Sequence, residues 1–231
     1  MIDPKKILSD FLGSNMPGTQ GSVRDTAGKG VQMAKDNPLA TGAIAAVLLG
    51  TGIGRSLSGS ALKLGGAAAV AGLAYTAYKN YKDGQKPVTA SEPPELIEAP
   101  AGSDFDLENG QDNADEFALT LVKAMIAAAR ADGHIDDDER AKIAEKLEMS
   151  GADDDAASFI RAELAKPVDL DQLVANAKTE AQRVELYTAS RLAIDPQTRA
   201  ERGYLDMLAG RLQLPDPLVD HIEATVAGAV A

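Results

Sequence analysis

The chain contains no cysteine and no tryptophan among its 231 residues, and aromatic residues make up only 4% of it. The absence of cysteine excludes disulfides, thiolate metal ligands and cysteine nucleophiles. With so few aromatic side chains, a core has to be built from Ala, Leu, Ile and Val, which favours close helix packing over a β-sandwich. No uncharged run reaches the roughly 20 residues that span a bilayer.

Charge is plentiful but unevenly distributed. Residues 1–90 hold 10 Lys and Arg against 5 Asp and Glu, residues 91–231 hold 13 against 30, and the whole chain carries −12. The acidic C-terminal part has no basic stripe with interleaved aromatic residues, so we expect no nucleic-acid partner. The basic, Gly-rich front is better suited to anionic lipid.

Composition divides the chain into four segments. Residues 1–37 join a short amphipathic pattern to a Gly-rich stretch, and residues 38–82 carry two Gly/Ala-rich uncharged runs. Residues 83–115 hold four prolines and scattered acids, which predict a flexible linker. Apolar residues recur at helical spacing through residues 116–229. These residues predict a compact all-α domain of about seven helices.

Residues 38–82 predict a helical hairpin. Small residues repeat there every four positions, which lets helix backbones approach closely, as in membrane helix pairs. Tyr75, Tyr78 and Tyr81, interleaved with lysines, resemble an interfacial anchor. We expect the hairpin to be membrane-associated, with small-residue faces that also suit a homo-oligomer. A soluble pair of small-residue helices is the alternative, and hydropathy does not decide between them.

Two acidic corners interrupt the helical pattern. Residues 131–140 crowd five carboxylates into one turn: Asp132, Asp136, Asp137, Asp138 and Glu139. Residues 186–202 form a weaker copy in which Asp195 corresponds to Asp132 and Glu201 to Glu139. If the corners face each other, their oxygens suit Ca²⁺, Mg²⁺ or Mn²⁺, although the spacing does not fit an EF-hand.

The same residues also have a purely structural interpretation. Asp136 with Glu139, and Thr198 with Glu201, have the spacing of capping boxes at helix N-termini. Asp195–Pro196 also has the order of a cap residue followed by a first-turn proline, which predicts a helix start there. Both interpretations of the corners stay open.

Nothing in the sequence indicates an enzyme. The two histidines, His134 and His221, are not in a ligand-spaced pair, and we expect both at polar surface positions. No Ser occupies a nucleophile-turn motif.

The run 127–139 (AAARADGHIDDDE), together with Ala193-Ile194-Asp195 and residues 201–209, resembles the TerB-like (tellurite-resistance) helical domains, and most closely their YebE-type inner-membrane branch. The resemblance implies a seven-helix fold with pseudo-twofold halves. It also implies an acidic metal-binding patch, formed here by Asp132, Asp136, Glu139, Asp195 and Glu201.

The expected function follows from these features and from the resemblance. We expect a non-enzymatic module at the bacterial inner membrane, with its C-terminal domain facing the cytoplasm. Its acidic domain would bind a divalent cation or a partner protein in an envelope or stress response. The alternative is a purely structural helical scaffold for protein interaction, without metal.

Overall fold

The computed structural model describes residues 4–11, 66–87, 96–107, 113–131, 154–194 and 196–230. Within these ranges the regular structure is entirely helical, which confirms the predicted all-α class. The helices are α1 (Pro4–Phe11), α6 (Gly66–Lys82), α7 (Ala114–Ala129), α9 (Asp154–Ala165), α10 (Leu170–Asn176), α11 (Glu180–Ala193), α12 (Arg199–Leu212) and α13 (Asp216–Val230).

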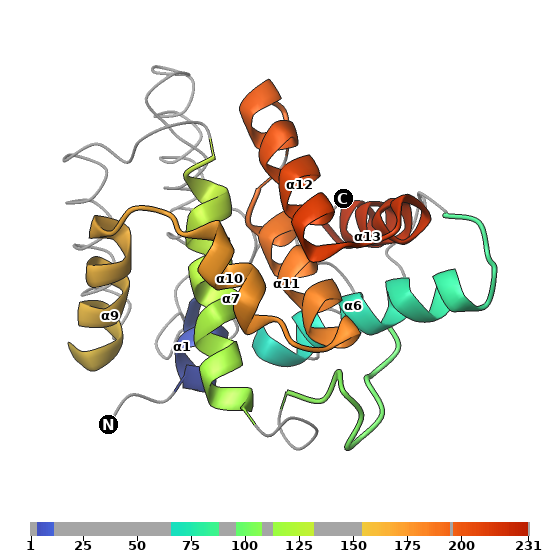
Figure 1. The fold of residues 1–231 in the computed structure, drawn as a ribbon. Coiled ribbons are helices and arrows are strands. Elements are labelled where there is room, and N and C mark those ends of the chain that lie inside the picture. Colours follow the sequence, from blue (N-terminus) through green and yellow to red (C-terminus); the bar gives the residue numbers. More distant parts are fainter. Residues whose placement is uncertain are drawn as a thin grey trace, which may run out of the picture.

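Helices α7 and α11 form the centre of the fold and pack along each other (Figure 1). Most of their residues are buried, including Phe117 and Leu121 in α7 and Leu186 in α11. Alanine supplies much of the remaining contact surface of α7, so its backbone approaches its neighbours closely. This agrees with a core assembled from small and aliphatic residues. Helix α1 covers another side of α7, while α10 and α9 also contact it.

Helix α12 packs on α11, and α13 packs on both α11 and α6. The N-terminus of α11 is fixed by a capping box, in which Thr179 Oγ1 accepts from Gln182 N at 3.1 Å. Asp169 caps α10, because its Oδ1 accepts from Gln172 N at 2.9 Å. Such caps satisfy N–H groups that have no partner inside the helix.

The prediction of a helix start at Asp195–Pro196 is wrong. Helix α12 begins at Arg199, and Thr198 is its cap residue. The carbonyls of Pro196 and Gln197 instead accept hydrogen bonds from Arg202 Nη1, at 3.1 and 2.8 Å. The capping box at Thr198 therefore sets the start of the helix, and the proline lies in the connection before it.

Helix α6, the last part of the predicted hairpin, lies in the common core. Val70, Leu73, Ala74 and Ala77 are completely buried, and the helix packs on α13, α11 and α1. Within the described residues, no helix is both long and apolar enough to cross a membrane. The other part of the hairpin, residues 38–65, lies outside the described residues.

The tyrosines that resemble a membrane anchor make contacts inside the protein. The rings of Tyr75 and Tyr78 lie 5.5 and 5.2 Å from the ring of Phe105, measured between centroids. Phe105 belongs to the predicted linker, where Leu96 and Leu107 are also buried. The described part of that linker, residues 96–107, is thus packed against the helices.

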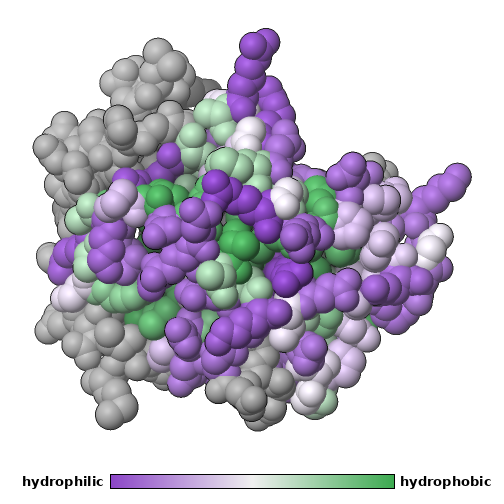
Figure 2. Space-filling view, viewed as in Figure 1, coloured by the Kyte–Doolittle hydropathy of each residue, from purple (hydrophilic) through white to green (hydrophobic). Residues whose placement is uncertain are grey.

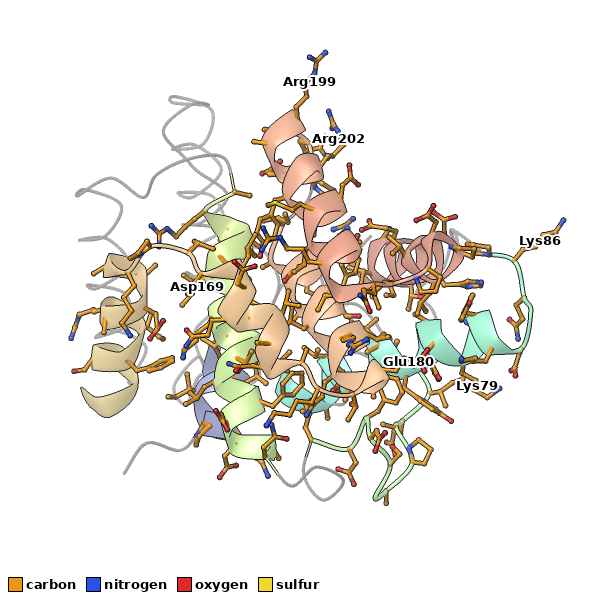
Figure 3. The ribbon with its side chains drawn as sticks, in the orientation of Figure 1. Lys79, Lys86, Asp169, Glu180, Arg199 and Arg202 are labelled. Carbon is orange, nitrogen blue, oxygen red and sulfur yellow. The ribbon has the colours of Figure 1, made fainter. Side chains whose placement is uncertain are left out.

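The end of α6 is joined to α11 and α13 by polar contacts. Tyr78 donates to Glu180 Oε2 at 3.0 Å, and Lys82 Nζ lies 3.5 Å from Glu180 Oε1; Figure 3 shows Glu180 beside this helix. His221 of α13, expected at a polar surface, is only 5% exposed. Its Nε2 lies 3.1 Å from the carbonyl oxygen of Gln85.

Candidate functional site

Most of the residues predicted to form a metal patch cannot be compared with the structure. Asp132, Asp136, Glu139 and Asp195 lie outside the described residues. Glu201 is described, in the first turn of α12, where it is only 5% exposed. Within the described ranges, no three histidine or carboxylate side chains are grouped so that they could hold a metal ion.

Glu201 is part of the capping box that begins α12. Its Oε2 accepts from Thr198 N at 2.7 Å, and its own N–H donates to Thr198 Oγ1 at 3.2 Å. The local chemistry of a capping box accounts for this geometry completely. A hard cation prefers oxygen ligands, so the Glu201 carboxylate is a suitable metal ligand by type. One of its two oxygens, however, already accepts a hydrogen bond at the N-terminus of α12.

The helices that lead into the two corners end on the same side of the molecule. In Figure 1, α7 and α11 run in the same general direction, so their C-terminal ends both lie toward the top of the view. The chain leaves the described part of α7 at Ala131 and leaves α11 at Ile194. This arrangement is compatible with corners that lie near each other.

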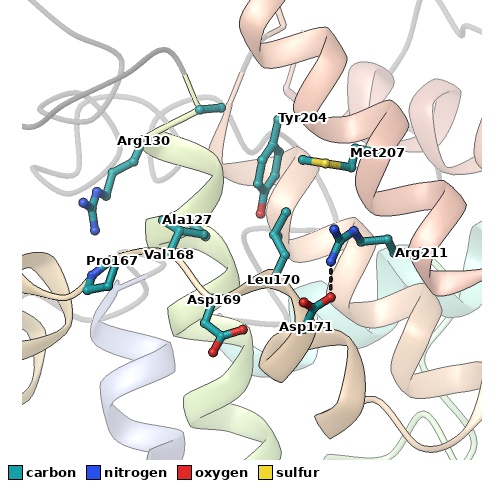
Figure 4. Close-up of a pocket in the computed structure, with 11 residues that line it drawn as sticks. Ala127, Arg130, Pro167, Val168, Asp169, Leu170, Asp171, Tyr204, Met207 and Arg211 are labelled. Carbon is teal, nitrogen blue, oxygen red and sulfur yellow. Dashed lines mark hydrogen bonds and ion pairs between the residues drawn. The ribbon is translucent and has the colours of Figure 1, made fainter.

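A groove of about 550 Å³ lies beside the end of α7 (Figure 4). One wall is the last turn of α7, with Ala127, Arg130 and Ala131, and the floor is the connection 167–169 and the start of α10. The opposite wall comes from α12, which contributes Tyr204, Met207 and Arg211. The spacing of these three residues places them on one face of the helix, one above another.

Two exposed apolar side chains converge on this groove. Among the described residues, only three large hydrophobic side chains are exposed, namely Ile97 at 36%, Val168 at 41% and Met207 at 44%. Val168 lines the floor of the groove, and Met207 lines its α12 wall. Figure 2 shows hydrophobic residues near the middle of this face, where α10 and α12 meet, with hydrophilic residues around them.

The charged groups around the groove make contacts within the protein. Arg211 Nη1 pairs with Asp171 Oδ1, and Asp169 Oδ1 is used by the cap of α10. Arg130 Nη1 donates to the carbonyl oxygen of Lys166 at 2.6 Å, which fixes the end of α7 to the connection after α9. These contacts hold the three walls in place.

Tyr204 is the buried polar residue on the α12 wall of the groove. It is only 7% exposed, and its Oη has no hydrogen-bond partner in the described part of the chain. The hydroxyl of the neighbouring Ser190 donates to the carbonyl oxygen of Leu186, at 3.0 Å. Burial raises the pKa of the Tyr204 phenol, with a smaller opposing effect from Ser190, so the phenol stays protonated at neutral pH. In Figure 4 the hydroxyl points from α12 toward Leu170, into the groove.

Sequence reasoning did not identify this groove. Tyr204 belongs to the stretch that carries the resemblance to TerB-like domains, but nothing in it indicates an unpartnered hydroxyl. A signal is present in retrospect, because Tyr204, Met207 and Arg211 recur at i, i+3 and i+7 and include one exposed apolar residue. Val168 gives no such signal, since it lies in an irregular connection.

Comparisons with known proteins match the chain to a family and to a relative. A family described as "Protein of unknown function (DUF533)", which has a TerB-like fold, matches residues 34–226. A Yersinia enterocolitica protein described as an uncharacterized protein in the ampR 5' region is 30% identical over 112 residues. That alignment covers 48% of this chain and 81% of the Yersinia protein. No solved structure matches the chain significantly.

Proposed function

The chain belongs to the DUF533 family, and from this premise we propose that it is a non-enzymatic binding module. It holds a peptide segment of a partner protein in the groove between α7, α10 and α12. The observation that carries the proposal is the convergence of Val168 and Met207 on this groove. Exposed apolar side chains gathered in one concave place are typical of interaction sites, whereas single scattered ones are not.

The form of the groove favours a peptide over a small molecule. Its walls come from two helices and the connection 167–169, so a chain segment can lie along it. Met207 contributes a flexible thioether that adapts to differently shaped side chains. An apolar side chain of the partner would fit between Val168 and Met207, and its backbone would run along α12.

A displayed library of random peptides, selected on the full-length protein, tests this proposal. We expect selected peptides to share an apolar anchor and to lose binding to the Val168→Asp and Met207→Asp variants, because a carboxylate there disfavours an apolar contact. Ile97→Asp is the matched control, since Ile97 is similarly exposed but does not line the groove. Selected peptides that bind all three variants as tightly as the wild type would overturn the proposal.

Self-association is the other occupant that this experiment distinguishes. A second copy of the chain in the groove would give a concentration-dependent mass in sedimentation equilibrium, abolished by Met207→Asp. That result would replace the partner peptide with a homo-oligomer.

Cation binding at the acidic corners is a second candidate function. Its support is the acidic sequence of both corners, together with the common side on which α7 and α11 end. Under this proposal, millimolar Ca²⁺, Mg²⁺ or Mn²⁺ raises the melting temperature of the wild-type chain, because a ligand that binds only the folded state stabilises it. The double variant Asp132→Asn with Glu139→Gln removes that shift. No shift in the wild type with any of the three ions excludes this candidate.

A further proposal is that residues 38–82 associate with a membrane. With it goes membership of the YebE-type inner-membrane branch and a role in an envelope or stress response. Its support is the Gly/Ala-rich composition of the front part of the chain. Since α6 packs on α11 and α13, insertion would fall to the uncharged run 39–54. Full release of the protein by a carbonate wash of membranes would refute insertion.

A further inference from the structure

We infer that the groove recognises a hydrogen-bond acceptor, a carboxylate above all, next to the apolar anchor of its peptide. Tyr204 is the residue that donates a hydrogen bond to this acceptor. This inference rests on the proposed function and adds the chemistry of the segment that binds. It assigns to Tyr204 a role in specificity, distinct from the packing role of Met207.

The first step of the argument is the unmet hydrogen-bond capacity of Tyr204. Its side chain is more than nine-tenths buried, its hydroxyl points into the groove, and Oη has no partner among the described residues. A buried hydroxyl without a partner is unfavourable by roughly 1–3 kcal/mol, and such groups are uncommon in native proteins. A bound acceptor would remove that penalty, and the penalty would return whenever a ligand lacked the acceptor.

The second step is that the groove also holds a charged donor, the Arg211 guanidinium. Asp169 Oδ1 is occupied by the α10 cap, and Asp171 Oδ1 is paired with Arg211. Arg211 uses Nη1 for that pair. Because the Arg211 and Asp171 side chains are 41% and 89% exposed, their ion pair is weak and exchanges readily for a ligand carboxylate.

The third step is the geometry along α12. Tyr204 and Arg211 flank Met207 on the same helix face, at three and four residues from it. An apolar side chain seated against Met207 therefore has a donor on either side. A carboxylate one or two positions from the anchor would accept from Tyr204 or from Arg211, and charge-assisted hydrogen bonds of this kind are stronger than neutral ones.

The test uses the peptides selected on the wild-type full-length chain. We expect an acidic residue beside the apolar anchor, and we expect Tyr204→Phe to weaken binding by about five- to tenfold, the effect of one lost hydrogen bond. Replacing the acidic residue of the peptide with its amide or with alanine should weaken binding to the wild type but leave binding to Tyr204→Phe nearly unchanged. A purely structural role of Tyr204 would not produce that coupling.

The outcomes separate this inference from the proposed function. Peptides that depend on Val168 and Met207 but bind Tyr204→Phe as tightly as the wild type would overturn the inference and leave the docking groove intact. Failure to recover any peptide sensitive to Val168→Asp and Met207→Asp would overturn the proposed function itself. The melting temperature of Tyr204→Phe serves as the folding control, and we expect it to equal or exceed that of the wild type, because only an unpartnered hydroxyl is removed.

Discussion

The Arg191 guanidinium of α11 lies 2.6 Å from Glu223 Oε2 of α13, and its side chain is only 8% exposed. Arg191 Nη1 also donates to the carbonyl oxygen of Ile194 at 2.7 Å, and Tyr187 donates to the other Glu223 oxygen at 2.9 Å. One carboxylate thus joins two side chains of α11 to α13. The same guanidinium closes the C-terminal end of α11, where the chain turns toward α12.

Removing the guanidinium should destabilise the whole domain. Arg191→Ala leaves the Ile194 carbonyl and Glu223 without their buried guanidinium donor. We expect the free energy of unfolding to fall by about 2 kcal/mol. This is less than the loss for a fully buried pair, because the Glu223 side chain is one-third exposed. Urea unfolding followed by circular dichroism measures it. Lys79→Ala is the control, since the Lys79–Asp83 pair is exposed and should contribute nothing measurable. Equal losses in the two variants would contradict the central role of Arg191.

The buried tyrosines should make the fold sensitive to alkaline pH. Burial raises the pKa of Tyr187, with Glu223 adding to the rise, and burial also raises the pKa of Tyr204, both above the ordinary value of 10.0. A raised folded-state pKa gives stability that is complete below the unfolded pKa and declines as pH rises above it. We expect each phenol to lower the free energy of unfolding by about 1.4 kcal/mol per pH unit above roughly pH 10.

Unfolding in urea at about pH 9 and about pH 11 measures this decline. Tyr204→Phe and Tyr187→Phe should each make it shallower by the contribution of one group, whatever their stability at neutral pH. A decline of the same steepness in the wild type and in both variants would show that other groups cause it.

Helical periodicity and cap chemistry made the α-class and several helix ends predictable from sequence. Thr198 and Glu201 form the capping box that their spacing indicates, and Asp169 and Thr179 cap α10 and α11 through partners three positions along the chain. These are local features, because each depends on residues three or four positions apart. The mistaken start at Asp195–Pro196 also concerned local chemistry, where two cap signals competed within four residues.

Tertiary features were beyond the sequence for physical reasons. The Gly, Ala and Val residues of α6 suit a lipid environment and an alanine-rich helix interface equally, since both are apolar. The tyrosines on α6 likewise suit a membrane interface or a partner such as Phe105, because each has an apolar ring and a polar tip. The Tyr204 hydroxyl became a candidate for recognition only once its surroundings were known. Neither periodicity nor spacing reports which buried polar atoms lack a partner.

Leu73→Ala tests whether α6 belongs to the folded core. Leu73 is completely buried, and truncating it should lower the free energy of unfolding by about 3 kcal/mol, through lost apolar contact and the cavity left behind. Urea unfolding of the full-length chain in detergent-free buffer measures the change. Leu73→Met preserves volume and should cost less than about 1.5 kcal/mol. If Leu73→Ala unfolds at the wild-type urea concentration, α6 does not share the core of α11 and α13.

The capping box at Thr198 gives the means to separate helix capping from cation binding. Thr198→Ala removes the acceptor for Glu201 N and should cost about 1 kcal/mol in unfolding free energy. Glu201→Gln keeps an oxygen that can accept from Thr198 N, since Gln also serves at this position of a capping box, but it removes the negative charge. Without added ions, Glu201→Gln should therefore be nearly as stable as the wild type.

Added Mn²⁺ or Ca²⁺ makes the two variants diverge if Glu201 binds a cation. Thr198→Ala keeps the carboxylate and should retain any ion-dependent rise in melting temperature, from a lower starting point, whereas Glu201→Gln should lose part of it. If Glu201→Gln keeps the full rise shown by the wild type, the role of Glu201 is to begin α12, and any bound cation takes its oxygens from other residues.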